Sequence, residues 1–237
     1  MMQDLFASDV RFTPVPIPDA DVCFLTHLPL DMSDEEVFLK LRNETIWQHE
    51  EVVVWGKKHL QPRLTAWYGD PGQKYAYSGT EMNPLPWTNL LLYLKRRVEE
   101  LSGAEFNSVL LNLYRDHRDR MGFHSDNERE LGAEPVIASL SFGETRTLLF
   151  KHKRRKDLPL KPVTLTSGSL LLMKGRTQQN WNHGINSESA PCGARINLTF
   201  RRIFAKTKND APKRRERSWP EPSIRDSTPK KPPPRLI

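Results

Sequence analysis

The second half of the chain is a succession of short segments that have the composition of β-strands. They are β-branched or alternate between polar and apolar residues, turn residues separate them, and they cover residues 106–115, 135–143, 146–153, 163–175 and 194–203. Many short strands with turns between them are typical of an antiparallel sandwich or barrel. The pattern therefore predicts that the body of the protein is a β-sandwich or jelly roll.

Two amphipathic helices are expected ahead of these strands. Residues 31–44 contain a capping box, in which Ser33 is the N-cap and Glu36 follows three positions later. Residues 86–103 have apolar residues at helical spacing and end at Gly103, a common helix stop. Helices followed by many strands predict an α+β fold, a jelly-roll core with the N-terminal helices packed on it.

The two ends of the chain differ in composition from its centre. Residues 1–22 are spaced by prolines and are expected to lie extended on a surface. Residues 206–237 hold ten Lys and Arg residues against four acidic ones, and seven of the 19 prolines. Such segments cannot bury enough apolar surface to fold. We expect a folded domain over residues 23–205, followed by a disordered basic tail that contacts phosphates, serves as a nuclear address or only aids solubility.

Cysteine usage and hydropathy indicate the compartment. Cys23 and Cys192 are too few for a disulfide framework, which favours a reducing compartment. No apolar run approaches the roughly 18–20 residues of a membrane span, and the N-terminus lacks the pattern of a secretory signal. We expect an intracellular monomer without membrane contact, cytoplasmic in a bacterium and nuclear in a eukaryote.

The segment MGFHSDNERE, residues 121–130, places His124 and Asp126 two positions apart. On an extended segment these side chains share a face, with Cα atoms roughly 6–7 Å apart, so both can reach one ion. A third ligand is available in His183, far along the chain in NWNHGI. Two histidines and one carboxylate with open positions form the metal site of non-haem Fe(II) oxygenases. Taken singly, each histidine is more often structural, and His117 remains a rival ligand.

The segment RINLTFR alternates without a fault, and its polar face carries Arg195, Asn197, Thr199 and Arg201. Asn112 and Tyr114 share a face of an earlier segment in the same way. The ordinary interpretation of both patterns is a solvated outer face. If a keto acid chelates the metal, however, its far carboxylate needs a cation inside the barrel, and Arg binds carboxylates as a bidentate fork. Arg195 would then supply that cation.

Four stretches of the chain together resemble one known family. NLYRDHRDRMGFHSD, PVIASLSFGETRTLLF, GSLLLMKGRTQQNWNH and RINLTFR are similar to the AlkB-type Fe(II)- and 2-oxoglutarate-dependent dioxygenases, above all to the nucleic-acid dealkylases among them. The similarity runs from about residue 50 to residue 203 and keeps the order of the His-x-Asp, distal His and Arg-x5-Arg motifs.

The resemblance implies a double-stranded β-helix core and a set of ligands. Fe(II) would be bound by His124, Asp126 and His183, and 2-oxoglutarate by Asn112, Tyr114, Arg195, Asn197 and Arg201. The implied reaction uses dioxygen and 2-oxoglutarate to demethylate 1-methyladenine and 3-methylcytosine in DNA, and in some members RNA. It releases succinate, carbon dioxide and formaldehyde.

Five residues are candidates for contact with the substrate: Tyr77, Glu128, Trp55, Tyr75 and Tyr68. By the resemblance Tyr77 holds the stacking position, while Tyr75 and Tyr68 are equally well explained as core aromatics. Glu128 would accept a hydrogen bond from an exocyclic amino group, or else is an exposed loop acid. Trp55 would be a wedge at a hairpin tip that fills the gap left by a flipped base, or else a core residue.

Two further stretches bear on the nucleic-acid substrate. The run KHKRRK, residues 151–156, is expected to project as a hairpin that binds phosphates, with a solvated turn as the alternative. The loop at residues 184–194 has no basic residue, which leaves action on single strands open. Two other functions also remain open: a dioxygenase of the same fold that acts on modified RNA or protein, and a nucleic-acid-binding module without catalysis.

Overall fold

The computed structural model describes residues 10–54, 57–72, 75–77 and 80–204. The expectations for Trp55 and for the tail at residues 206–237 fall outside these residues. In the part of the chain that is described, no helix is both long and apolar enough to cross a membrane.

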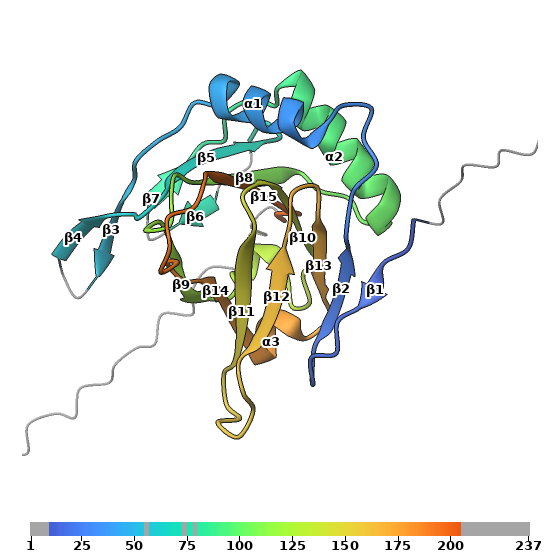
Figure 1. Ribbon diagram of the computed structural model, residues 1–237, viewed down its shortest axis with the longest axis vertical. Helices are drawn as coiled ribbons and strands as arrows, with labels where there is room; N and C mark the ends of the chain where they lie inside the picture. Colours follow the sequence, from blue (N-terminus) through green and yellow to red (C-terminus); the bar gives the residue numbers. More distant parts are fainter. Residues whose placement is uncertain (1–9, 55–56, 73–74, 78–79, 205–237) are drawn as a thin grey trace, which may run out of the picture. The chain divides into compact units, whose positions relative to one another are not determined.

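Two antiparallel sheets make up the body of the protein (Figure 1). The larger has the order β1-β2-β13-β10-β15-β8-β5 and the smaller the order β12-β11-β14-β9. The strands of the larger sheet are β1 (Thr13–Pro14), β2 (Asp21–Leu25), β5 (Leu64–Gly69), β8 (Ser108–Tyr114), β10 (Ile137–Gly143), β13 (Leu170–Lys174) and β15 (Arg195–Arg201). Those of the smaller sheet are β9 (Met121–His124), β11 (Arg146–His152), β12 (Lys161–Leu165) and β14 (Trp181–Ile185). This antiparallel arrangement is that of a jelly roll.

Two hairpins and four helices complete the described elements. The hairpins pair β3 (Glu51–Val54) with β4 (Lys57–Leu60), and β6 (Tyr75–Tyr77) with β7 (Thr80–Met82). The helices are α1 (Asp34–Glu44), α2 (Asn89–Ser102), the one-turn α3 (Thr177–Asn180) and the 3-10 turn η1 (Arg129–Leu131).

The helix ends follow from local chemistry. The hydroxyl of Ser33 accepts a hydrogen bond from the Glu36 amide at 3.2 Å, as the capping box predicts. Thr88 caps α2 in the same way through the Leu91 amide. Gly103 ends α2 in the left-handed conformation, with φ 66°, which a residue without a Cβ adopts at little cost.

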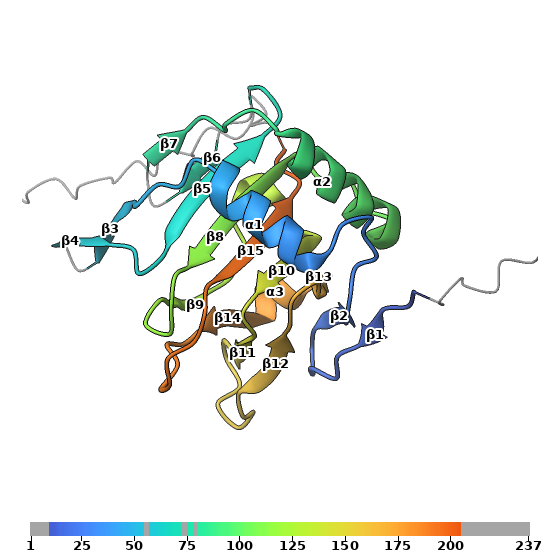
Figure 2. The same ribbon diagram turned by 45° about the horizontal axis from the view of Figure 1, so that its top comes forward.

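One apolar cluster lies between the helices and the larger sheet. Val37 and Leu41 of α1 and Leu94 of α2 share it with Leu198 and Phe200 of β15. Figure 2 shows α1 lying across the strands of this sheet. A second cluster, which includes Phe150, Trp181, Leu171 and Tyr114, contains residues of both sheets.

The positions of these two apolar clusters show which way each face of β15 points. Its apolar residues belong to the cluster beneath the helices, and every residue of the strand is buried. The polar face therefore points away from the helices and into the space between the sheets. The interpretation of RINLTFR as a strand with a solvated outer face is wrong, because α1 and α2 cover the apolar side and leave the polar side as the interior one.

We expect Leu41→Ala to lower the free energy of unfolding by about 2–5 kcal/mol, because Leu41 is 1% exposed and its removal opens a cavity under α1. Leu39→Ala in the same helix is the matched control, since Leu39 is 46% exposed and its loss should change stability by at most about 0.5 kcal/mol. Urea denaturation measures both. Equal losses would mean that α1 does not pack on the sheet.

Candidate functional site

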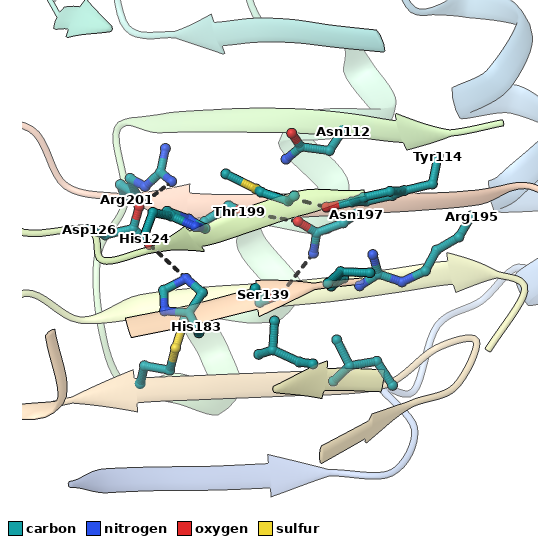
Figure 3. Close-up of a pocket in the computed structure, with 16 residues that line it drawn as sticks. Asn112, Tyr114, His124, Asp126, Ser139, His183, Arg195, Asn197, Thr199 and Arg201 are labelled. Carbon is teal, nitrogen blue, oxygen red and sulfur yellow. Dashed lines mark hydrogen bonds and ion pairs between the residues drawn. The ribbon is translucent and has the colours of Figure 1, made fainter. Parts of the chain in front are cut away.

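A pocket between the two sheets collects the polar residues that the sequence singles out (Figure 3). Its polar lining consists of Asn112, Tyr114, His124, Asp126, Ser139, His183, Arg195, Asn197, Thr199 and Arg201. β8 and β15 are paired antiparallel strands, and their register places Arg195 opposite Tyr114 and Asn197 opposite Asn112. The alternation of two strands thus places four polar side chains on one wall.

His124, Asp126 and His183 meet at one end of this pocket. β9 and β14 are neighbours, and His124 pairs with His183 across them, with the two ring centroids 4.4 Å apart. Asp126 follows β9, and its Oδ2 lies 3.7 Å from Nε2 of His183. One ligand atom from each of the three residues lies within 4.8 Å of the others. The rival His117 is not a member of this group.

Two contacts hold Asp126, one through its carboxylate and one through its backbone. Arg201 donates from Nη2 to Oδ1 at 2.6 Å, and the backbone N–H of Asp126 donates to Oε1 of Gln178 at 2.9 Å. Burial by itself raises the pKa of Asp126, but the charge of Arg201 is the largest opposing influence, and the pKa lies below its usual value. Asp126 is therefore an ionised acceptor, the form in which a carboxylate binds a metal.

The two imidazoles differ in what holds them. Burial, followed by the neighbouring His124, lowers the pKa of His183 to about 3, so that its ring carries no charge at neutral pH. Nδ1 of His124 lies 3.0 Å from the carbonyl oxygen of Gly122. A carbonyl only accepts, so this nitrogen carries the proton and Nε2 keeps its lone pair.

An orphaned carboxylate oxygen indicates that a cation fits here. Oδ2 of Asp126 is buried, has no hydrogen-bond partner, and lies 3.7 Å from Nε2 of His183. Buried polar atoms without partners are rare in folded proteins. Imidazole nitrogens and a carboxylate oxygen are the donor set that suits Fe(II).

The other end of the pocket contains a buried cation. Arg195 is 1% exposed, donates from Nη2 to Oγ of Ser141 at 2.9 Å, and lies over the Tyr114 ring with Cζ 5.2 Å from its centroid. Its Nε and Nη1 have no hydrogen-bond partner. Burial lowers the pKa of Arg195 to about 10, which still leaves it charged at neutral pH. A buried, half-paired guanidinium in a pocket has the geometry and charge to bind a carboxylate.

The remaining wall residues are mostly bonded to one another. Nε of Arg63 donates to Oδ1 of Asn112 at 2.7 Å, and Nδ2 of Asn197 donates to the hydroxyl of Ser139 at 2.8 Å. Arg201, expected to complete the cosubstrate wall, lines the same pocket and donates to Asp126. Arg195 keeps two buried N–H donors that a bound anion could accept.

Sequence reasoning missed several residues of the site. Ser139 and Ser141 could have been found, because they alternate with Ala138, Leu140 and Phe142 in a segment that reads as a strand. Gln178 carries no such signal, since it lies in the one-turn helix α3 and reaches Asp126 across 52 positions of sequence.

The candidate substrate contacts are distributed unevenly. Glu128 lines an open groove together with His124, Arg120 and Phe123, and its Oε2 is buried without a partner. His124 lines both this groove and the pocket. The groove therefore adjoins the three-ligand group.

The three tyrosines also differ. Tyr68 is 2% exposed in the cluster beneath the helices, and its hydroxyl accepts from the Ile46 amide, so its interpretation as a core aromatic holds. Tyr75 and Tyr77 lie in β6, and their side chains fall outside the described part of the structure, as does Trp55.

Comparisons with known proteins agree with this site. Residues 24–201 match the model of the 2OG-Fe(II) oxygenase superfamily. Alpha-ketoglutarate-dependent dioxygenase alkB homolog 3 of Bos taurus is 40% identical over 178 residues, which are 72% of this chain and 62% of that protein. DNA oxidative demethylase ALKBH2 of Homo sapiens is 38% identical over 179 residues, 72% of this chain and 69% of that protein.

A solved structure of OsALKBH1 has the same fold, with a TM-score of 0.58 at 16% identity over 81% of this chain and 100% of that one. The chain spans about six tenths of the length of alkB homolog 3. Membership of the superfamily implies Fe(II), 2-oxoglutarate and dioxygen as its cofactor and cosubstrates. The match to the family model and the two relatives place this chain among the AlkB-type 2OG-Fe(II) oxygenases.

Proposed function

We propose that this protein oxidatively demethylates alkylated bases in DNA, with 1-methyladenine and 3-methylcytosine as substrates and formaldehyde as a product. The observation that carries the proposal is one pocket with three metal-type ligands at one end and the half-paired guanidinium of Arg195 at the other. Similarity to proteins named DNA oxidative demethylase supports DNA as the substrate. We extend the proposal to an intracellular monomer whose catalytic domain covers residues 23–205, with the N-terminal helices packed on the jelly roll.

His124, Asp126 and His183 would hold Fe(II). The chemistry that the iron supplies when bound is the activation of dioxygen, by which a methyl C–H bond is oxidised while 2-oxoglutarate loses carbon dioxide. The chain's own contribution is to fix the ligands: the Gly122 carbonyl sets the tautomer of His124, and Arg201 and Gln178 hold Asp126.

Arg195 would bind the far carboxylate of 2-oxoglutarate. Ser141 and the Tyr114 ring already hold the guanidinium in place, so little side-chain freedom remains to be lost on binding. Asn112, Tyr114 and Asn197 would form the wall beside it. A dicarboxylate suits such a pocket, because one end would meet the Arg195 cation and the other would reach the metal that His124, Asp126 and His183 would hold.

The groove beside His124 would receive the base. A base must leave its stack to reach a buried site, at a cost of a few kcal/mol, and methylation of the pairing edge reduces that cost. Glu128 lines this groove with an orphaned Oε2, which would accept a hydrogen bond from an exocyclic amino group. Tyr77 and Tyr75 would supply stacking, worth roughly 1–3 kcal/mol per base, and Trp55 would act as the wedge in a duplex.

We expect formaldehyde release from 3-methylcytosine oligonucleotides that depends on both Fe(II) and 2-oxoglutarate. The same modified base should be presented in single-stranded DNA, duplex DNA and RNA at one salt concentration. His183→Ala is the control: it should abolish release and leave oligonucleotide affinity in place, because it removes a metal ligand and no nucleic-acid contact. Release from RNA alone would reassign the substrate, and no release from either form of DNA would remove the repair function.

Arg195→Met should weaken 2-oxoglutarate binding about 30-fold or more, because truncating one partner of a buried charge pair costs at least about 2 kcal/mol. Arg202→Met is the matched control, since Arg202 directly follows β15, is exposed, and pairs with Glu105. Isothermal titration calorimetry with Mn(II)-loaded protein measures both. Wild-type affinity in the Arg195 variant would contradict its role as the carboxylate anchor.

The same variant has a second readout. Without cosubstrate, Arg195→Met should be as stable as the wild type or more stable, because a buried half-paired charge is replaced by an apolar side chain of similar length. Added 2-oxoglutarate should raise the melting temperature of the wild type alone. A large loss of stability in the metal- and cosubstrate-free variant would instead make Arg195 a structural residue.

A further inference from the structure

The hairpin between β11 and β12 carries the basic run KHKRRK at residues 151–156, and the structure divides this run. His152 is buried, and its Nδ1 accepts from the backbone amides of Arg154 and Arg155 at 3.1 and 2.8 Å. The side chain of Arg155 pairs with nearby carboxylates. Lys153 differs from the exposed cations of the run, because its side chain is half-buried and bonded inside the protein.

Lys153 makes three hydrogen bonds to two other segments of the chain. Its Nζ donates to Oγ of Ser125 at 2.8 Å and to the carbonyl oxygen of Gln178 at 2.7 Å. Its backbone N–H donates to the carbonyl oxygen of Asn180 at 2.8 Å. Bonds from an ammonium group are charge-assisted and stronger than neutral ones.

One of these segments contains two candidate metal ligands, and the other leads directly into the third. Ser125 is the residue between His124 and Asp126. Gln178 accepts from the backbone of Asp126 through its side chain, and α3, in which it lies, leads directly into β14 and His183. The two bonds of the Lys153 ammonium therefore join the two segments that supply the three ligands.

We propose that Lys153 is a positioning residue that fixes the distance between the 124–126 segment and α3, and thereby sets the affinity of the site for its metal. The proposal rests on the metal centre proposed above and adds to it a residue that touches no ligand atom. Residues that hold metal ligands in place without touching the metal orient those ligands, and their loss weakens metal binding or activity by about 10–100-fold.

The competing role for Lys153 is the phosphate contact that the sequence predicts for the whole run. An ammonium has three N–H donors, and two of them are bonded to Ser125 and Gln178. The exposed Arg154 and Lys156 of the same hairpin have no such internal bonds from their side chains in the described structure. Phosphate contact therefore suits these two residues better than Lys153.

The test compares Lys153→Met with Lys156→Met, which removes the same charge from the same hairpin. Co(II) alone, without 2-oxoglutarate or nucleic acid, is titrated into each metal-free protein and followed by its visible absorption. We expect Lys153→Met to raise the dissociation constant about 10–100-fold and Lys156→Met to leave it unchanged. Equal Co(II) affinity in the two variants would overturn the proposal.

A second experiment measures the binding of an unmodified oligonucleotide to the same two variants at several salt concentrations, and here Lys156→Met is the variant expected to differ from the wild type. Lys156→Met should reduce the salt dependence, because a phosphate contact is lost, and Lys153→Met should not. A Lys153 variant that binds Co(II) like the wild type but has a shallower salt slope would assign Lys153 to phosphate. Failure of the wild-type protein to bind Co(II) would instead count against the metal centre itself.

Ser125→Ala keeps the proposal testable if Lys153→Met does not fold. It removes one acceptor of the ammonium without touching a ligand atom, and we expect a smaller weakening of Co(II) binding in the same direction. Where both variants fold, the double variant should bind Co(II) no more weakly than Lys153→Met, because both changes break one connection. Wild-type Co(II) affinity in Ser125→Ala, or fully additive losses, would show that this contact does not position the ligands.

Discussion

The half-paired guanidinium of Arg195 is the constraint on which the rest of the site depends. Burying an arginine to 1% exposure while two of its nitrogens have no hydrogen-bond partner costs free energy of folding. Such a group is expected where the protein binds an anion. The cost is offset on the opposite face of the same strand, where Ile196, Leu198 and Phe200 are completely buried beneath the helices. The helices thus contribute to the site indirectly. Because they cover the apolar face of β15 and shield it from water, the polar face of the strand points into the space between the sheets.

The same strand serves both ends of the pocket. Arg195 at its start keeps donors for a carboxylate, while Arg201 at its end is bonded to Asp126. A seven-residue strand is rigid once it is hydrogen-bonded on both sides, as β15 is to β10 and β8. The spacing between Arg195 and Arg201, and so the distance from Arg195 to the Asp126 that Arg201 bonds, is therefore set by a sheet strand and not by a loop. Such rigidity suits the proposed reaction, in which one molecule would contact both ends of the pocket.

Local pattern predicted the elements but not their orientation. The alternation of RINLTFR identified the strand and the members of each face, and the Ser33 capping box and Gly103 identified helix ends. Which face lies inside depends on what covers the other, and periodicity carries no information on that. Gln178 and Lys153 could not be predicted for a related reason, because their bonds cross 52 and 28 positions of sequence and leave no local signal. Arg201 was assigned to the cosubstrate by resemblance, and the structure adds a bond to Asp126 that the resemblance did not predict.

The two oxygens of Asp126 have different surroundings, and this bears on how a metal would bind. Oδ1 is paired with Arg201, so the charge of the buried carboxylate is compensated before any ion arrives, while Oδ2 has no hydrogen-bond partner. The ligand segments are held by Arg201, Gln178 and Lys153 and by the sheet pairing of His124 with His183. Bonds within the protein therefore fix the positions of the three candidate ligands, and they leave Oδ2 of Asp126 as the carboxylate oxygen for an ion.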